Sequence, residues 1–165
     1  MGMAEKKEHA VVTGQWPLSA YRWKTERFLD RYLEGLRERK ILGLRCANCG
    51  TVFVPPTIVC ARCHSRLRLE RDEDWLRVSE QGTVITYTVS YTDVAPGGLR
   101  ELSPEERRIF VLVQLDNVDT HILLELKESS EEEVRVGMRV RAVWAEETEG
   151  KLSDLACFRP LSGSS

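Results

Sequence analysis

The sequence predicts a mainly β protein with an N-terminal helix, in which a zinc ribbon is followed by a five-stranded, OB-fold-like antiparallel barrel. Three observations predict this class. Four of the five cysteines form two Cys-x-x-Cys pairs, the segment before them has helical periodicity, and the chain after them contains runs in which apolar and polar residues alternate. With 165 residues, the chain has room for one ordinary domain or for a small β domain with attachments.

Composition places the chain among globular proteins. Hydrophobic residues make up 42% and charged residues 30% of the sequence, which is too apolar for a disordered chain and too charged for a membrane protein. The longest apolar run, residues 109–113, is far shorter than the ~18 residues that a membrane span requires. The first residues contain no apolar signal core. We therefore expect a cytoplasmic protein without membrane contact.

The first elements expected are a flexible N-terminus over residues 1–17 and an amphipathic helix over residues 18–40. In the helical segment Ser19 offers an N-cap, whereas Gly35 costs stability. Apolar side chains recur there mostly at steps of three to five residues, namely Trp23, Phe28, Tyr32, Leu33 and Leu36. Because a small zinc unit cannot bury the whole apolar face, the helix packs either on the downstream domain of its own chain or on a partner subunit.

A zinc ribbon is expected over residues 41–72. Disulfides are disfavoured in a cytoplasmic chain, so two closely spaced Cys-x-x-Cys pairs indicate one tetrahedral Zn²⁺ ion held by the thiolates of Cys46, Cys49, Cys60 and Cys63. Four thiolates leave no coordination position for a substrate, which predicts a structural metal. Three alternatives stay open: His64 as one of the ligands, iron in place of zinc, and a redox role for a Cys-x-x-Cys pair.

The OB-fold domain is expected over residues 73–160, followed by a C-terminal tail over residues 161–165. Alternation and turn signals predict five strands, at residues 82–91, 109–115, 120–126, 138–145 and 151–158. An open sheet or an SH3-like barrel would produce a similar pattern. One face of the first strand is predicted to belong to the core, with Ile85, Tyr87, Val89 and Tyr91. Residues 92–108 are rich in turn formers and charge, and we expect a loop that carries the substrate-specific contacts.

The order of these motifs resembles a known family, family 35 of the domains of unknown function, whose acyl-CoA-associated members join a rubredoxin-like zinc ribbon to an OB fold. The resemblance covers residues 17–160. It is carried by a helix followed in order by Arg45-Cys46-x-x-Cys49-Gly50, Pro55-Pro56, Cys60-x-x-Cys63, Gly82-Thr83-Val84, Val111-Leu112-Val113-Gln114-Leu115 and Gly137-Met138-Arg139-Val140. His64 departs from the family pattern, which has a glycine after the fourth cysteine.

This resemblance implies a function. Members of the family are small partner subunits of thiolases and of MaoC-like hydratases. The implied role is a non-catalytic accessory subunit of a thiolase that cleaves a 3-oxoacyl-CoA in a degradation pathway, within a hetero-oligomer that shares the CoA thioester. A MaoC-like enoyl-CoA hydratase or an acyltransferase complex is the alternative partner that the resemblance implies.

Charge is distributed unevenly along the chain. Residues 22–71 contain 12 basic and 5 acidic residues, a net charge of +7, whereas residues 72–165 contain 10 basic and 19 acidic residues, a net charge of −9. Either these segments complement each other or the basic one binds anions. Because arginine suits phosphate groups, the resemblance makes the arginines beside the cysteines candidates for contact with CoA: Arg45, Arg62, Arg66 and Arg68.

A single-strand nucleic-acid-binding protein is the remaining alternative, because zinc ribbons and OB barrels both occur in such proteins. Tyr87 and Tyr91 would stack on bases, but the overall net charge of −2 and the acidic second half argue against it. No catalytic residue is expected in the chain itself. Cys157 is interpreted as an apolar filler and His121 as an exposed or capping residue, and the sequence contains no His-Glu-x-x-His motif.

Overall fold

The computed structural model describes residues 27–95 and 97–161. Several predicted features lie outside these ranges: the flexible N-terminus at residues 1–17, the part of the predicted helix that contains Ser19 and Trp23, and residues 162–165 of the tail. No helix within the described ranges has the length and apolar character that crossing a membrane requires.

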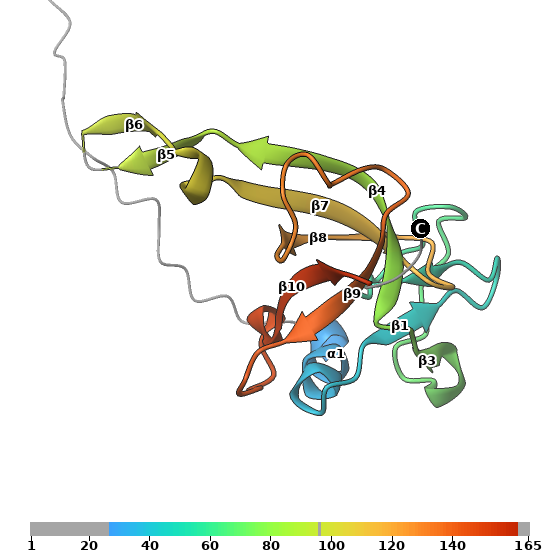
Figure 1. Cartoon of the computed structure of the whole chain (residues 1–165). Coiled ribbons are helices and arrows are strands. Elements are labelled where there is room, and N and C mark those ends of the chain that lie inside the picture. The colour runs from blue at the N-terminus through green and yellow to red at the C-terminus, as the bar shows by residue number, and fades with distance from the viewer. Residues whose placement is uncertain (1–26, 96, 162–165) are drawn as a thin grey trace, which may run out of the picture.

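One α-helix, ten strands and three short 3₁₀ helices make up the described chain (Figure 1). The α-helix and the 3₁₀ helices are α1 (Arg27–Arg37), η1 (Asp72–Asp74), η2 (Pro104–Glu106) and η3 (Leu152–Asp154). The strands are β1 (Leu42–Arg45), β2 (Val52–Phe53), β3 (Trp75–Arg77), β4 (Gln81–Ser90), β5 (Thr92–Ala95), β6 (Gly98–Glu101), β7 (Arg108–Leu115), β8 (His121–Leu126), β9 (Arg139–Trp144) and β10 (Leu155–Pro160).

Helix α1 packs on its own chain through one apolar face. Tyr32 and Leu36 are buried in the core, and burial raises the pKa of Tyr32 to about 12. Gly35 faces β1, where an added Cβ atom would lie 2.8 Å from the Leu42 side chain. Glycine therefore lowers the helix propensity but allows the helix to approach the sheet closely. Of the two alternatives for the helix, packing on its own chain holds for residues 27–37.

The cysteine-containing segment forms a three-stranded sheet. β1 lies in the middle and pairs antiparallel with β2 and with β3. β3 begins at Trp75, beyond the expected end of the ribbon at residue 72, so the ribbon sheet is completed by the first residues of the segment assigned to the OB domain. The guanidinium of Arg31 in α1 lies 5.1 Å from the centroid of the Trp75 ring, which connects the helix to this third strand.

The barrel confirms the predicted OB-like fold. All five predicted strands are present, and they close in the order β10-β8-β7-β4-β9. One pairing departs from the predicted antiparallel arrangement, because β10 runs parallel to β8. The reason is geometric: a closed ring with an odd number of strands cannot alternate in direction all the way round, so one neighbouring pair must be parallel.

The core face predicted for the first barrel strand is partly wrong. A β-bulge interrupts the register of β4 with β7 at Ile85, which is 38% exposed. Tyr87 and Tyr91 are 40% and 47% exposed, whereas Val89 packs partly against the core. β4 continues past the body of the barrel (Figure 1), so the side chains near its end have fewer neighbours to cover them.

One hydrophobic core joins the helix, the ribbon and the barrel. Its members with no measurable exposure include Leu36 from α1, Leu44 from β1, Val84 from β4 and Phe158 from β10. The ribbon and the barrel are therefore packed into one body rather than being connected only by a linker.

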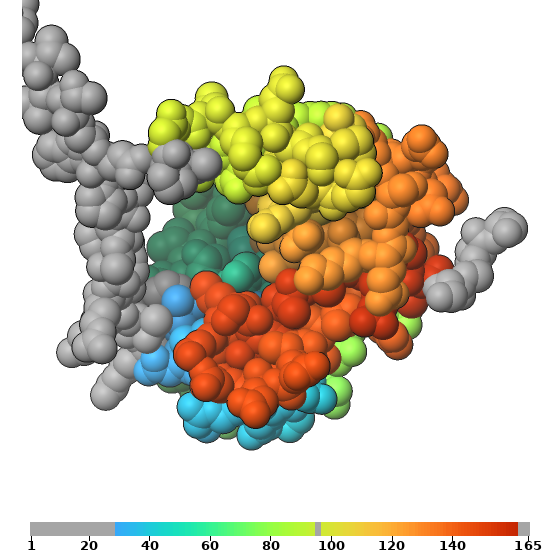
Figure 2. Space-filling view, turned by 60° about the vertical axis from the view of Figure 1, so that its left-hand side comes forward, coloured from blue at the N-terminus to red at the C-terminus, as the bar shows by residue number. Residues whose placement is uncertain are grey.

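The segment expected to be a loop contains a β-hairpin. β5 and β6 pair in register from Thr92 opposite Glu101 to Ala95 opposite Gly98. In Figure 1 this hairpin extends from the ends of β4 and β7 and projects away from the barrel, and in Figure 2 its yellow-green and yellow atoms form one border of the molecular surface.

Candidate metal centre and its surroundings

Two turns of the same construction present the four cysteines. In the first, the Cys46 N–H donates to the Thr51 carbonyl at 2.8 Å and the Gly50 N–H donates to the Cys46 carbonyl at 2.8 Å. In the second, the Cys60 N–H donates to the Ser65 carbonyl and the His64 N–H donates to the Cys60 carbonyl, both at 2.9 Å. Gly50 and His64 occupy equivalent positions with φ of 78° and 60°. His64 therefore takes, in the second turn, the position that Gly50 takes in the first.

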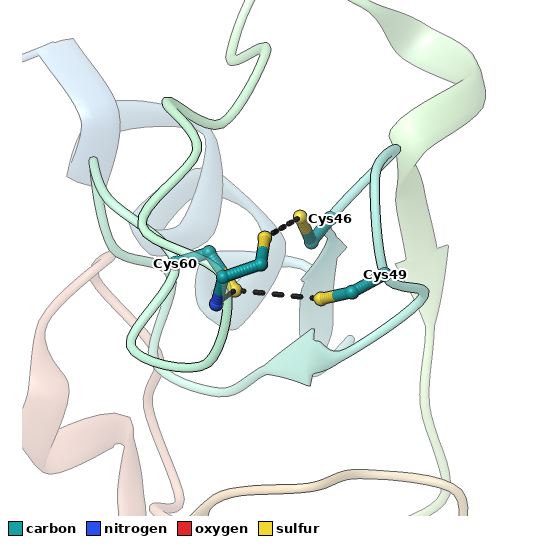
Figure 3. A group of neighbouring side chains, drawn as sticks. Cys46, Cys49 and Cys60 are labelled. Atoms are coloured by element: carbon teal, nitrogen blue, oxygen red, sulfur yellow. Dashed lines mark hydrogen bonds between the residues drawn. The ribbon is translucent and has the colours of Figure 1, made fainter.

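The four thiols face one another (Figure 3). The Sγ atoms of Cys46 and Cys63 are 3.6 Å apart, those of Cys49 and Cys60 are 3.5 Å apart, and all four lie within 4.8 Å of one another. A tetrahedral zinc ion with Zn–S bonds of about 2.3 Å places its sulfurs about 3.8 Å apart. The donor set and the spacing therefore fit a zinc ion held by four thiolates. His64 is exposed and is not part of this group of side chains, so the alternative in which it is a ligand is not supported.

The surroundings of the thiols lower the pKa of two of them, Cys49 and Cys63, and so favour the thiolate form that binds a metal ion. Hydrogen bonds from Asn48 and Ser65 lower the pKa of Cys63 to about 5, and the hydrogen bond with Thr51 lowers the pKa of Cys49. Burial acts in the opposite direction on Cys60 and raises its pKa to about 11. Metal ligation needs thiolates, and a divalent cation supplies the positive charge that a buried thiolate lacks.

Four thiolates close the coordination sphere of zinc, so a metal held here is structural. Within residues 27–95 and 97–161, the cysteine quartet is the one cluster of three or more Cys, His, Asp or Glu side chains with metal-binding geometry. The fifth cysteine, Cys157, lies apart from the quartet in β10 and is 5% exposed, which agrees with its interpretation as an apolar filler. His121 is exposed at the start of β8, also in agreement with the prediction.

Hydrogen bonds connect the ribbon to the turn between β7 and β8. The Val52 N–H donates to the Asp119 carboxylate at 2.8 Å, and the Asp119 N–H donates to the Val52 carbonyl at 3.0 Å. The Thr120 hydroxyl accepts from the Val54 N–H and donates to the Val54 carbonyl, both at 2.8 Å. The sequence pattern places Thr120 at the start of a strand and gives no sign of these bonds, because they join Asp119 and Thr120 to a segment more than sixty residues away.

The four arginines expected to contact CoA have different surroundings. Arg68 is paired with the buried carboxylate of Asp74 at 2.7 and 2.9 Å, and this pairing lowers the pKa of Asp74. Arg45 donates to the Glu73 carbonyl at 3.1 Å. Arg62 and Arg66 are exposed on the second cysteine turn and make no side-chain hydrogen bond or ion pair with the described residues. Two of the four arginines, Arg45 and Arg68, are therefore used for pairing within the chain. Arg62 and Arg66 are the two that are accessible to a ligand.

A second connection, between α1 and the barrel, involves the segment between β9 and β10. The Arg39 guanidinium donates to the carbonyls of Ala145 and Glu146 at 3.3 and 2.8 Å. The Thr148 hydroxyl donates to the Arg37 carbonyl at 2.8 Å. Sequence reasoning missed these contacts as well, because side-chain bonds to backbone carbonyls leave no periodic signal.

Comparison with known families matches both parts of the chain. The profile described as ChsH2, rubredoxin-like zinc ribbon domain, matches residues 33–70, and the profile described as ChsH2, C-terminal OB-fold domain, matches residues 75–145. The two profiles follow each other in the order seen in the structure, and together they include the cysteine quartet and most of the barrel.

Curated relatives include two archaeal proteins, both named DUF35 domain-containing scaffold protein. The protein from Methanocaldococcus jannaschii is 28% identical over 120 residues, which cover 72% of this chain and 78% of the relative. The protein from Methanothermobacter thermautotrophicus is 32% identical over 62 residues, which cover 34% of this chain and 44% of the relative.

Two solved structures share the fold. A chain from the structure described as the Ltp2-ChsH2(DUF35) aldolase is 25% identical, with a TM-score of 0.57 and coverage of 84% of this chain and 98% of that chain. A DUF35 family protein of unknown function from Sulfolobus solfataricus is 20% identical, with a TM-score of 0.58 and coverage of 82% and 85%.

Proposed function

Because the chain belongs to DUF35, the family that joins a rubredoxin-like zinc ribbon to an OB fold, we propose that it is a non-catalytic accessory subunit of a thiolase-type acyl-CoA enzyme. In this role it stabilises the enzyme subunit and helps to hold the CoA thioester, while the enzyme subunit cleaves a 3-oxoacyl-CoA. The observation that carries the proposal is the closed set of four thiols, connected to the barrel through the Asp119 and Thr120 turn. A zinc ion there contributes rigidity rather than chemistry.

The names of similar proteins support an accessory role beside an enzyme. The two archaeal relatives are called scaffold proteins, and the similar solved chain comes from a structure described as an aldolase. Aldolases and thiolases both break or form carbon–carbon bonds, which favours a thiolase-type partner over a hydratase for this chain.

For the CoA contact, we assign Arg62 and Arg66 on the second cysteine turn. Their guanidinium groups are exposed, whereas the guanidinium of Arg68 is already paired with Asp74. Planar guanidinium groups form bidentate hydrogen bonds with phosphates, and the CoA diphosphate and 3′-phosphate provide several acceptors. Arg62 lies between the metal ligands Cys60 and Cys63, and Arg66 follows the turn in a β-bridge with Val59, so both arginines are presented on a fixed backbone.

A nucleic-acid-binding role is less well supported. The Tyr91 ring is covered by its own chain's Arg107, whose guanidinium carbon lies 4.6 Å from the ring centroid, and the Tyr91 hydroxyl donates to Glu131. The neighbouring groove is lined by four glutamates against two arginines, which would repel a phosphate backbone: Glu105, Glu125, Glu131, Glu132, Arg107 and Arg108.

Co-expression tests the accessory role. A thiolase-type enzyme from the same organism is produced alone and together with this chain, and solubility, co-elution and thiolytic activity are measured. We expect one complex at fixed stoichiometry and an enzyme that is insoluble or inactive alone. A fully active enzyme that does not co-elute with this chain would refute the proposal. The same experiment with a MaoC-like hydratase or an acyltransferase tests the alternative partners.

The CoA contact has its own test within the complex. Replacing Arg62 and Arg66 with glutamate should raise KM for CoA about tenfold or more, because phosphate attraction becomes repulsion. Arg77→Glu is the matched control, since Arg77 is exposed on the ribbon sheet but lies on β3, away from the cysteine turns. An unchanged KM in the double variant would eliminate the assigned CoA contact and leave the accessory role intact.

A further inference from the structure

The β5–β6 hairpin carries the two most exposed large apolar side chains among the described residues. Val94 is 80% exposed and Leu99 is 78% exposed. The two residues are directly opposite each other in the hairpin register, so their side chains lie next to each other on one face. Single exposed apolar side chains are ordinary, but an adjacent pair on a projecting element is typical of an interaction surface.

The base of the hairpin is held in place on the barrel. The Leu102 N–H donates to the Tyr91 carbonyl at 2.9 Å, on the two chain segments that enter and leave the hairpin. Arg107 lies over the Tyr91 ring and donates to Glu131 at 3.3 Å. Tyr91 also donates to Glu131, so an aromatic ring, a cation and a carboxylate fix the position where the hairpin begins.

The polar face of the hairpin is fixed as well. Arg100 donates to both carboxylate oxygens of Glu106 at 2.9 and 3.0 Å. Glu106 also accepts from the Ser103 N–H at 3.1 Å and so closes the capping box of η2. Arg100 and Leu99 are adjacent residues in a strand and point to opposite faces. The bonded face thus holds the hairpin in position, and the apolar face is left uncovered.

The charges around the apolar pair indicate the chemistry of the surface that covers it. Glu101 shares a face with Leu99, is exposed, and forms no ion pair with the described residues. A complementary surface has an apolar pocket for Val94 and Leu99 and a basic side chain at its rim for Glu101.

Three grooves of this chain do not have that character. The two beside the hairpin have volumes of about 470 and 480 Å³, and a third near the β7–β8 turn has about 510 Å³. In each of them carboxylates outnumber basic side chains. A second copy of this chain would therefore repel Glu101 at these grooves, which favours a different protein as the occupant.

We infer that the β5–β6 hairpin is a docking arm that inserts Val94 and Leu99 into an apolar pocket with a basic rim on the enzyme subunit. The inference rests on the proposed function and adds to it the surface through which the two subunits meet. Because the arm is fixed at its base and along its polar face, little conformational entropy is lost when the tip is buried.

The test measures the Kd of the complex that this chain, loaded with zinc, forms with the co-expressed thiolase-type enzyme, by analytical ultracentrifugation over a dilution series. The variant is Val94→Ser with Leu99→Ser, which removes apolar surface without adding charge. We expect Kd to rise about 100-fold or more, equivalent to about 2.8 kcal/mol at 1.4 kcal/mol per tenfold change. The matched control is Val136→Ser with Leu152→Ser, two residues that are 63% and 58% exposed away from the hairpin, and Kd should stay within threefold.

A second variant tests the charge. Glu101→Lys should raise Kd about tenfold at low salt, and added salt should then lower Kd instead of raising it, because a basic rim would repel the lysine. Circular dichroism and one metal ion per chain in every variant show that the fold is retained.

The outcomes separate the inference from the proposed function. If the wild-type chain binds the enzyme and the hairpin variant binds equally well, the docking arm is wrong and the accessory role stands. If the wild-type chain does not bind the enzyme, both are overturned. A concentration-dependent homodimer that is lost in the hairpin variant would identify a second copy as the occupant and would also overturn the inference.

Discussion

Replacing Asp154 with alanine removes the acceptor around which the connection from β9 to β10 is built. The residue is 3% exposed, and its carboxylate accepts hydrogen bonds from the backbone N–H groups of Glu149, Gly150 and Lys151 at 2.7 to 3.2 Å. Burial alone would raise the pKa of Asp154, but these three donors outweigh it and lower the pKa. The carboxylate is therefore charged at neutral pH and is tied to the loop.

The size of the effect follows from these contacts. A hydrogen bond to a charged group contributes about 1.5–3 kcal/mol, and the alanine variant leaves three donors without their acceptor. Water reaches part of the loop and offsets some of the loss, so we expect the free energy of unfolding to fall by about 3 kcal/mol. Asp154→Asn keeps one carbonyl acceptor and the side-chain volume, and it should cost about 1–2 kcal/mol.

The loss of order in this loop should also destabilise the C-terminal end of α1. The same loop binds the end of the helix, where the Arg37 guanidinium donates to the Glu149 carbonyl at 3.2 Å and the Thr148 hydroxyl donates to the Arg37 carbonyl at 2.8 Å. A disordered loop would release this end of the helix and expose the chain at Arg37 and Arg39. Trypsin should then cleave there sooner than in the wild-type protein.

The assay is urea unfolding followed by circular dichroism on zinc-loaded protein, combined with limited trypsin digestion. Asp116→Ala is the control, because Asp116 also forms a bidentate pair, with Arg139, but both side chains are 38% exposed. An exposed pair contributes about 1 kcal/mol or less. If Asp154→Ala is no more destabilising than Asp116→Ala, the reasoning from buried backbone donors is refuted.

Two further predictions concern the metal and acid stability. Cys46→Ser should unfold the ribbon and lower the metal content, measured by mass spectrometry, well below one ion per chain. Cys157→Ala should leave the metal content at one ion per chain. Equal metal contents in the two variants would refute the assignment of the ligands. Hydrogen bonds from Arg68 and Arg139 lower the pKa of Asp74 and Asp116, so the stability that these carboxylates contribute is complete above their unfolded pKa of about 3.9 and is lost as pH falls through their folded pKa. We expect Tm, measured by calorimetry together with metal release, to fall below about pH 4, and a loss of stability that begins near pH 6 without metal release would contradict this origin.

Much of the site was predictable because its signals are local. The spacing of the cysteines and the glycine or histidine that follows each pair specify two equivalent turns, and the structure contains both. Period-two patterns located the five barrel strands, although a pattern cannot reveal that an odd number of strands forces one parallel pair.

The features that the sequence did not predict depend on contacts between distant segments or on which side chains are exposed. The bulge at Ile85 shifts a register that looks regular in the sequence, and it leaves Tyr87 more exposed than its apolar neighbours predict. The sequence does not show that Arg68 is paired with Asp74 while Arg62 is not paired, because both arginines lie among similar neighbours in the chain. Residues 92–108 contain the glycines and charges of a loop, and their strands become evident only through the pairing of Val94 with Leu99.

The hydrogen bonds between residues 52–54 and the turn at Asp119 and Thr120 affect how fast the protein is degraded in the cell. We expect residues 52–54 to be disordered in a chain that has not acquired its metal, and the turn at Asp119 and Thr120 then loses the four hydrogen bonds that these residues make with it. Proteases degrade chains in proportion to how often they open. The amount of this subunit should accordingly follow the supply of zinc during growth, and any enzyme that depends on it would become scarce under metal starvation without losing a metal of its own.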